Sequence, residues 1–191
     1  MHPLVGAVLT GGASRRMGRN KALIDIDGVP MASRVAAVLR GAGCISVVAY
    51  GGSPVELESL GVPILPDRYP GTGPLGGVLG VLELFAASDF DIGGVFVTAC
   101  DLPALTSTDL VDIVEAAQAH PDADVVVART SAIEPTCALW NPLALERVRR
   151  CFDEGERALH VAIGRLTSVA VDVDPAAMRN INTPDDLGRY P

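Results

Sequence analysis

The sequence predicts a three-layer α/β fold in which a doubly wound, mainly parallel, twisted sheet lies between two layers of helices. Apolar strand-like runs alternate along the chain with amphipathic helix-like runs, as in consecutive βαβ units. The composition, 49% hydrophobic but only 4% aromatic, is rich in Val, Leu, Ala and Gly, which is typical of a buried parallel sheet. With 191 residues, the chain is expected to form one domain, residues 1–191, with a sizeable core.

The expected elements follow from the period of the apolar residues. The predicted strands are Val5–Leu9, Ser46–Tyr50, Val62–Leu65, Gly94–Ala99, Ala123–Ala128, Pro135–Trp140 and Ser168–Val173. The predicted helices are Met31–Arg40, Val55–Leu60, Leu75–Ala87, Thr108–His120, Pro142–Phe152, Glu156–Leu166 and Pro184–Arg189. Two helix starts carry capping signals: Thr106 with Asp109 resembles a capping box, and Thr183 precedes a proline.

One short stretch concentrates positive charge. The only lysine, Lys21, lies within seven residues of Arg15, Arg16 and Arg19, just after the apolar run that ends at Leu9, in a chain of net charge −8. Glycines in this stretch allow backbone N–H groups to face a common anion. The stretch therefore predicts an anion site, for which the polyphosphate of a nucleotide is the simplest occupant; a solvated arginine-rich turn is the alternative.

The composition argues against several classes of protein. An isoelectric point near 4.8 speaks against general nucleic-acid binding. No apolar run is long enough to cross a bilayer, and the N-terminus lacks a secretory signal pattern, so a cytoplasmic protein without membrane contact is expected. The four cysteines are far apart and expected to be reduced, and neither they nor the three histidines have metal-ligand spacing.

Three polar features directly follow predicted strands: the cationic loop after Leu9, Asp67 and Asp101. Ligands of parallel α/β sheets bind at the carboxyl ends of the strands. The sequence therefore predicts one cleft that these three features share.

The cationic loop differs from two common phosphate-binding motifs. Ala22 follows Lys21, so the loop is not G-x-x-x-x-G-K-[ST], and it also lacks G-x-G-x-x-G. It reads G-G-x-S-x-R-M-G-x-x-K instead. The segment Leu9–Ala22 resembles the signature of nucleotidyltransferases with a glycosyltransferase-A-like fold, and it is most similar to the molybdenum cofactor guanylyltransferases. Further matches follow in order at Pro66–Asp67, Gly73–Gly77, Cys100–Pro103, Glu134–Thr136, Gly155–Arg157 and Asn180–Leu187.

The resemblance implies a reaction between two anions. The terminal phosphate of molybdopterin, already carrying molybdenum, attacks the α-phosphorus of GTP, pyrophosphate leaves, and a guanine dinucleotide cofactor forms. GTP and molybdopterin are then the substrates and Mg²⁺ the cofactor, and transient contacts with other cofactor-biosynthesis proteins or recipient molybdoenzymes are expected. The main task of such an enzyme is charge neutralisation and alignment.

The resemblance also assigns roles to residues. Arg16, Lys21 and Asp101 are the implied catalytic residues. The implied nucleotide contacts are Leu9, Thr10, Gly11, Gly12, Lys21, Asp67, Gly73, Pro74 and Asp101. The implied acceptor contacts are Arg157, Asn180 and Asn182. Backbone amides near Gly11 and Gly12 are expected to help Arg16 and Lys21 hold the phosphates, and a loop cation such as Lys21 is expected to contribute little to folding.

Asp101 is the predicted Mg²⁺ ligand, because it ends an apolar strand and Mg²⁺ accepts one or two carboxylates together with phosphate oxygens and water. Structural alternatives remain open for each site. Asp101 and Asp67 are also typical turn residues, Arg157 can form a solvated pair with Glu156, and Asn180 and Asn182 can belong to a turn.

One departure from the family leaves the base open. Many relatives carry an asparagine near the end of the second strand that touches the base, whereas Val48–Gly52 contains none. A molybdopterin cytidylyltransferase, or another nucleotidyltransferase of this fold such as one acting on sugar phosphates, is therefore an alternative. A nucleotide-binding carrier without turnover is a third reading, and the intact Gly12, Lys21 and Asp101 speak against it.

Overall fold

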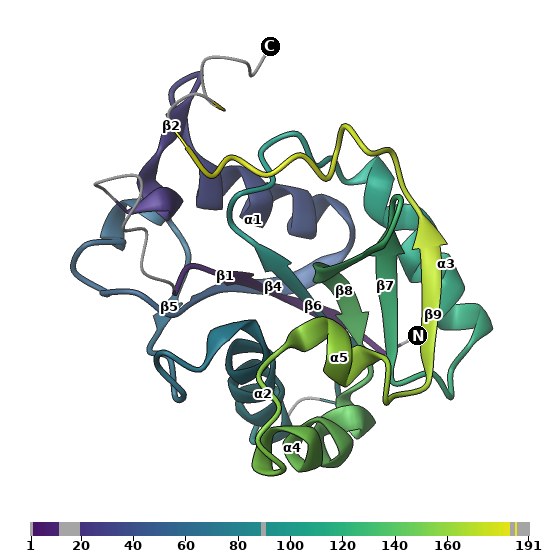
Figure 1. Ribbon diagram of the computed structural model, residues 1–191. Coiled ribbons are helices and arrows are strands. Elements are labelled where there is room, and N and C mark those ends of the chain that lie inside the picture. The colour runs from purple at the N-terminus through teal and green to yellow at the C-terminus, as the bar shows by residue number, and fades with distance from the viewer. Residues whose placement is uncertain (1, 12–19, 89–90, 184–185, 187–191) are drawn as a thin grey trace.

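The computed structural model describes residues 2–11, 20–88, 91–183 and 186, and its centre is a seven-stranded sheet (Figure 1). The strand order is β5-β4-β1-β6-β8-β7-β9. The strands of this sheet are β1 (Leu4–Leu9), β4 (Cys44–Tyr50), β5 (Ile64–Leu65), β6 (Gly94–Ala99), β7 (Val125–Arg129), β8 (Ile133–Trp140) and β9 (Ser168–Asp172).

The sheet is mainly parallel, as the alternation of elements predicted. β1 pairs in parallel with β4 and β6, β4 with β5, and β7 with β9. β8 is antiparallel to both of its neighbours, β6 and β7. A tight turn, in which the Thr130 N–H donates to the Ala132 carbonyl, joins β7 to β8, and a connection this short permits only antiparallel pairing.

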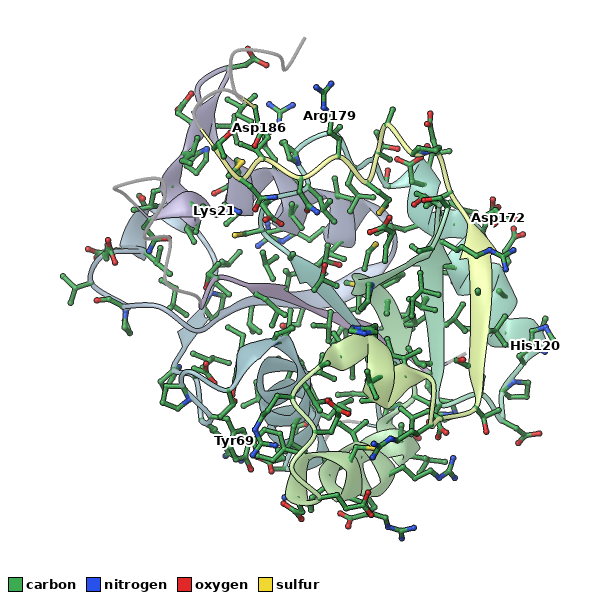
Figure 2. The ribbon with its side chains drawn as sticks, viewed as in Figure 1. Lys21, Tyr69, His120, Asp172, Arg179 and Asp186 are labelled. Carbon is green, nitrogen blue, oxygen red and sulfur yellow. The ribbon has the colours of Figure 1, made fainter. Side chains whose placement is uncertain are left out.

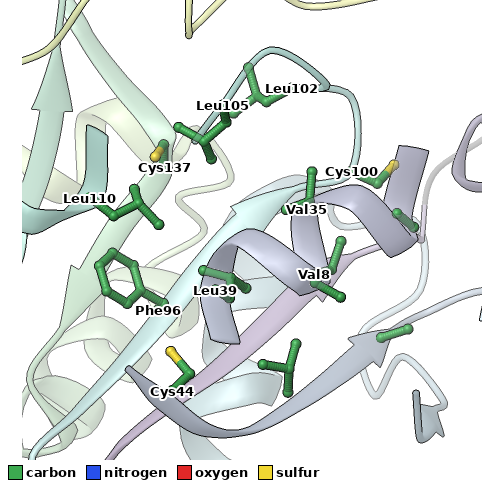
Figure 3. Close-up of a cluster of buried hydrophobic side chains, with 14 of the residues drawn as sticks. Val8, Val35, Leu39, Cys44, Phe96, Cys100, Leu102, Leu105, Leu110 and Cys137 are labelled. Carbon is green, nitrogen blue, oxygen red and sulfur yellow. The ribbon is translucent and has the colours of Figure 1, made fainter. Parts of the chain in front are cut away.

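Helices cover both faces of the sheet (Figure 1). They are α1 (Met31–Gly41), α2 (Gly73–Ala86), α3 (Val111–Ala119), α4 (Leu145–Asp153) and α5 (Leu159–Ile163). One buried cluster joins the sheet to α1 and α3 (part of it in Figure 3), and a second joins the opposite face to α2, α4 and α5. The expected three layers are confirmed, and no helix among the described residues is long and apolar enough to cross a bilayer.

Several predicted helices are shorter than the apolar period suggested. The expected helix over residues 55–60 is only the 3₁₀ turn η2 (Glu58–Leu60), which ends at Gly61 in the left-handed conformation with φ 67°. The expected helices from Thr108 and Pro142 begin with the 3₁₀ turns η3 (Thr108–Leu110) and η4 (Pro142–Ala144). The helix predicted over residues 184–189 lies outside the described residues except for Asp186.

The expected helix over residues 156–166 shrinks to α5 because its first residues bond to a side chain instead. The Glu156 carboxylate accepts the backbone N–H groups of Arg157 and Ala158, both at 2.8 Å. The two expected capping signals are present as hydrogen bonds: the Asp109 carboxylate accepts the Thr106 N–H, and the Thr183 hydroxyl accepts the Asp186 N–H. Local side-chain hydrogen bonds thus lie beside the starts of η3 and α5, which the apolar pattern alone leaves ambiguous.

A small hairpin was missing from the sequence prediction. It consists of the 3₁₀ turn η1 (Lys21–Leu23) followed by β2 (Asp25–Ile26) and β3 (Val29–Pro30). Asp27 and Gly28 form its turn, both with positive φ, and an Asp-Gly pair is a known hairpin signal. A third buried cluster contains Ile24, Ile26 and Met31 of this region together with Ile181. It ties the segment after β9 that contains Ile181, which we call the C-terminal segment, to the hairpin.

One close contact within the α2 layer generates a stability prediction. A Cβ atom at Gly80 would overlap the hydroxyl oxygen of Tyr50, which accepts the Arg68 N–H at 2.9 Å. We expect Gly80→Ala to destabilise the protein by about 1–3 kcal/mol in urea unfolding, because overpacking outweighs the better helix propensity of alanine, worth at most ~1 kcal/mol.

The matched background for this test is Tyr50→Phe, which removes the overlapping oxygen. The cost of Gly80→Ala should be smaller in that background, as measured by a double-mutant cycle. A Gly80→Ala protein more stable than the parent would contradict the close contact.

Candidate functional site

Four parallel strands end at the same edge of the sheet and carry the polar features that the sequence analysis singled out. β1 leads to Thr10 and Gly11, β4 to Gly51, β5 to Asp67 and β6 to Asp101. The strand order reverses at β1, because β4 and β5 lie on one side of it and β6 on the other. Such a reversal is where open α/β sheets place their ligands.

The loops after β1 and β4 touch through their backbones. The Thr10 hydroxyl donates to the Gly51 carbonyl at 2.7 Å, and the N–H groups of Thr10 and Gly11 both donate to the Tyr50 carbonyl, at 2.9 and 3.2 Å. Gly51 has φ 91°, and a Cβ there would lie 2.6 Å from the Cα of Gly11. Only glycine permits this approach.

These bonds hold the start of the cationic loop after Leu9, which is the predicted phosphate loop, against the end of β4. The Thr10 hydroxyl and the Gly11 N–H, both of predicted nucleotide contacts, therefore have partners inside the protein. The predicted contacts Gly12 and Arg16, together with Arg15 and Arg19, lie outside the described residues.

Lys21 makes the central contact of the site. Its Nζ donates to Asp101 Oδ2 at 2.7 Å and to Asn182 Oδ1 at 2.6 Å. The side chains of Lys21 and Asp101 are only 16% and 17% exposed. The structure thus brings together three predicted residues that are 80 and 161 positions apart in sequence.

Local structure around each partner explains this convergence. The Asn20 side chain accepts the Ala22 N–H and caps η1, which starts at Lys21. Ile181 is buried in the third cluster, and its N–H donates to the Asp101 carbonyl at 3.0 Å. The C-terminal segment therefore runs past α1 to the end of β6 (Figure 1; Lys21 and Asp186 in Figure 2).

The site contains oxygen atoms of the kind that coordinate a hard divalent cation. The Asp101 and Asn182 oxygens already converge on one cationic atom, the ammonium nitrogen of Lys21. Among the described residues no group of three or more His, Cys, Asp or Glu side chains is placed to hold a metal. Such a sparse set fits Mg²⁺ or Mn²⁺, which draw their remaining ligands from phosphate oxygens and water.

Cys100, which directly precedes Asp101 at this edge of the sheet, has an unreactive thiol. Burial is the main cause that raises the pKa of its thiol to about 12; the neighbouring Asp101 also raises this pKa, and Lys21 lowers it. The thiol is therefore protonated at neutral pH and is not a nucleophile.

The predicted nucleotide side lies around the loop between β5 and α2, residues 66–72, which we call the Asp67 loop. A Cβ at Gly11 would be 3.6 Å from Asp67 Oδ2, so this carboxylate faces the phosphate loop. Gly73 has φ 78° and Pro74 follows it in the first turn of α2. The Leu9 side chain packs against Gly77 of the same helix, close to these residues.

The start of α2 has no side-chain cap. The Thr72 hydroxyl donates back to the Tyr69 carbonyl at 2.5 Å and does not bond the first turn. The free N–H groups of that turn are therefore available to a polar ligand at this end of the helix.

The predicted acceptor residue Arg157 lies beside this loop. Its guanidinium stacks over the Phe152 ring at 3.9 Å and donates to the Phe152 carbonyl at 2.7 Å. A Cβ at Gly73 would be 3.7 Å from the Arg157 carbonyl. The Glu156 carboxylate accepts the backbone N–H of Arg157 and forms its ion pair with Arg165, at 3.6 Å. Of the two asparagines, Asn182 contacts Lys21, and Asn180 is exposed two residues earlier.

Sequence reasoning missed one residue that contacts the Asp67 loop, Glu83. It is a buried carboxylate in α2, a helix with nine buried positions, and it accepts hydrogen bonds from Arg68, Tyr69 and Arg149. The signal was present as the one charged side chain within the apolar run from Leu75 to Ala87.

The whole chain is similar to known nucleotidyltransferases. Residues 6–169 match the family model of the MobA-like NTP transferase domain. The chain is 34% identical to the molybdenum cofactor guanylyltransferase of Rhodobacter capsulatus, covering 97% of this chain and 94% of that protein.

Solved structures agree on the fold. Molybdopterin-guanine dinucleotide biosynthesis protein A from Archaeoglobus fulgidus has a TM-score of 0.75 at 24% identity, covering 96% of this chain and 95% of that one. A Mycobacterium tuberculosis protein in complex with manganese has a TM-score of 0.68 at 16% identity, covering 98% and 97%. The chain belongs to the MobA-like NTP transferase family, and its α/β fold is that of the nucleotidyltransferases.

Proposed function

We propose that this protein transfers GMP from GTP to the terminal phosphate of molybdopterin and releases pyrophosphate. The observation that carries the proposal is the convergence of Lys21, Asp101 and Asn182 at the carboxyl edge of the sheet, directly after the phosphate loop. Relatives similar over nearly the full length of the chain are named guanylyltransferases of the molybdenum cofactor, which supports the same activity.

In this proposal one P–O bond forms and another breaks at the α-phosphorus. An oxygen of the acceptor phosphate bonds to that phosphorus, and the bond to the β-phosphate oxygen breaks with its electron pair leaving on pyrophosphate. Lys21, with Arg16 and the amides after Gly11, neutralises the β- and γ-phosphates as negative charge grows on the leaving group. No protein nucleophile is needed, which agrees with the inert thiol of Cys100.

Asp101 is the proposed ligand of Mg²⁺. The side-chain oxygen of Asn182 contacts the same Lys21 ammonium nitrogen as the Asp101 carboxylate does. When bound, the metal would neutralise phosphate oxygens and favour an in-line arrangement of the triphosphate. Without it, the Lys21 ammonium neutralises the Asp101 carboxylate and donates a hydrogen bond to the Asn182 side chain. A metal ion bound at Asp101 would compete with the Lys21 ammonium for the same carboxylate oxygen.

The remaining assignments follow the geometry of the loops. Asp67, Gly73 and Pro74, with Leu9, line the proposed nucleotide side, where small residues permit close approach of a purine. Arg157 and Asn180 belong to the proposed acceptor side. The site residues follow strands of a single sheet. We therefore propose that they form one cleft and that residues 1–191 act as a single nucleotidyltransferase domain in the cytoplasm, transiently contacting other cofactor-biosynthesis proteins or recipient molybdoenzymes.

The deciding experiment compares GTP with CTP, using molybdopterin as the acceptor and pyrophosphate release as the readout. We expect turnover with GTP to exceed turnover with CTP at equal concentrations in the presence of Mg²⁺. Faster turnover with CTP would favour a cytidylyltransferase, consistent with the missing asparagine after β4. Tight GTP binding without pyrophosphate release would overturn the proposal in favour of a carrier.

Replacing Lys21 should lower turnover and raise the affinity for a divalent cation. In Lys21→Met we expect turnover to fall by about 100-fold or more, because charge on the leaving pyrophosphate is no longer neutralised. We also expect Mn²⁺ alone to bind the free protein about tenfold more tightly, because the competing ammonium is gone. Electron paramagnetic resonance of free Mn²⁺ measures the second effect.

The same variant should also be less stable, contrary to the expectation from sequence that a loop cation matters little to folding. The pair with Asp101 is largely buried, and a carboxylate left without its partner costs about 1–3 kcal/mol. The matched control is Arg129→Met, which breaks an exposed surface pair with Asp172 and removes the same charge. This control should leave Mn²⁺ binding and turnover unchanged; unchanged Mn²⁺ affinity in Lys21→Met would refute the competition.

Removing the carboxylate tests the metal ligand itself. We expect Asp101→Asn to lose most Mn²⁺ binding and to lower turnover by about 100-fold, because a neutral amide is a weaker ligand of a hard cation. Asp172→Asn, at the surface pair, is the matched control. If Asp101→Asn keeps the Mg²⁺ dependence of the parent protein, Asp101 is not a ligand.

A further inference from the structure

We propose that Glu83 is a positioning residue that holds the Asp67 loop and helix α4 at a fixed spacing over α2. The inference rests on the proposed function, since it assigns the nucleotide to the Asp67 loop. It adds a residue that touches no substrate but determines where the Asp67 loop and α4 lie relative to each other.

Glu83 joins two separate parts of the chain. Its Oε1 accepts the Tyr69 hydroxyl at 2.6 Å and Arg149 Nη1 at 2.8 Å, and its Oε2 accepts Arg68 Nη1 at 3.0 Å. The Glu83 side chain is 9% exposed. Burial by itself raises the pKa of this carboxyl, but the hydrogen bonds from Tyr69, Arg68 and Arg149 outweigh it and hold the pKa below its ordinary value. Glu83 is therefore charged at neutral pH.

The first connection is to the nucleotide side. Arg68 and Tyr69 directly follow Asp67, and the Tyr69 N–H donates to Asp67 Oδ1 at 2.9 Å. The other carboxylate oxygen, Oδ2, faces Gly11. Because Glu83 holds the side chains of the two residues after Asp67, it sets the direction in which the Asp67 carboxylate points.

The second connection is to the acceptor side. Arg149 and Phe152 both belong to α4, and the Tyr69 ring packs against the Phe152 ring with centroids 5.0 Å apart. The other neighbour of Phe152 is the guanidinium of Arg157. Figure 2 shows Tyr69 at α2 and α4, on the far side of the sheet from Lys21. One carboxylate thus fixes the spacing between the Asp67 loop and the helix that supports Arg157.

Stability alone does not explain a carboxylate at this position. An apolar side chain in place of a buried ion pair is often equally or more stabilising, and Glu83 interrupts an otherwise apolar face of α2. What the charged group adds is direction, because its two oxygens accept from three donors at defined angles. That is the requirement of a site that must be held rigidly.

The test uses Glu83→Gln, which keeps the shape and removes the charge. We expect KM for GTP and the dissociation constant of GTP to rise about tenfold, while kcat changes by less than about threefold, because the Asp67 loop contributes to binding. Tyr69→Phe, which removes one hydroxyl donor and keeps the ring on Phe152, should produce a smaller rise of the same kind. It also serves if Glu83→Gln does not fold.

The control is a second buried carboxylate that pairs with the same helix. Asp124 directly precedes β7 and is 3% exposed. Its carboxylate accepts hydrogen bonds from Arg147 of α4 and from the Thr167 N–H. Asp124→Asn should lower the melting temperature and leave KM for GTP unchanged. Equal rises of KM in Glu83→Gln and Asp124→Asn, or no rise in Glu83→Gln and Tyr69→Phe, would overturn the positioning role.

These outcomes are separate from those that test the proposed function. If the parent protein releases pyrophosphate from GTP and Glu83→Gln has an unchanged KM, only the positioning role fails. If the parent protein does not turn over GTP with molybdopterin, the proposed function fails, and the dissociation constant of the nucleotide that it binds still tests Glu83.

Discussion

The contact of Lys21 with Asp101 and Asn182 is the interaction on which the arrangement of the site depends. It joins the segment after the phosphate loop, the end of β6 and the C-terminal segment. An ammonium group between two oxygens neutralises a largely buried carboxylate, and a buried charge is costly without such a partner. The same two oxygens are suited to a divalent cation, so one place in the molecule serves both as a structural ion pair and as a candidate metal site.

The rest of the fold brings these segments to one edge. Parallel pairing of β1 with β4 and β6 puts the ends of these strands side by side, and the packing of Ile24, Ile26 and Met31 with Ile181 holds the C-terminal segment against the hairpin. On the opposite face, Glu83 ties the Asp67 loop and α4 to α2. The two sides of the proposed site are therefore supported by different parts of the core, an apolar cluster on one side and a buried carboxylate on the other.

Sequence reasoning succeeded where local chemistry carries the information. Alternating apolar runs predicted the strands and layers, and the short polar segments after β1, β5 and β6 predicted the edge at which Asp67 and Asp101 lie. It failed at Glu83, whose donors are 14, 15 and 66 positions away. It also failed on the lengths of α5 and η2, which depend on local hydrogen bonds of the Glu156 carboxylate and on a glycine turn that the apolar period does not contain.

The sequence by itself determined the fold class, the order of the strands of the main sheet, and the family, because periodicity and the loop from Leu9 to Ala22 are local patterns. Only the tertiary structure decided which groups are already engaged. The Thr10 hydroxyl and the Gly11 N–H bond the strand beside them, Lys21 bonds Asp101, and Arg157 lies on Phe152. The reason is physical: whether a hydrogen bond or ion pair forms depends on differences in distance of a few tenths of an ångström. The packing of remote segments sets these distances, and the order of residues alone does not.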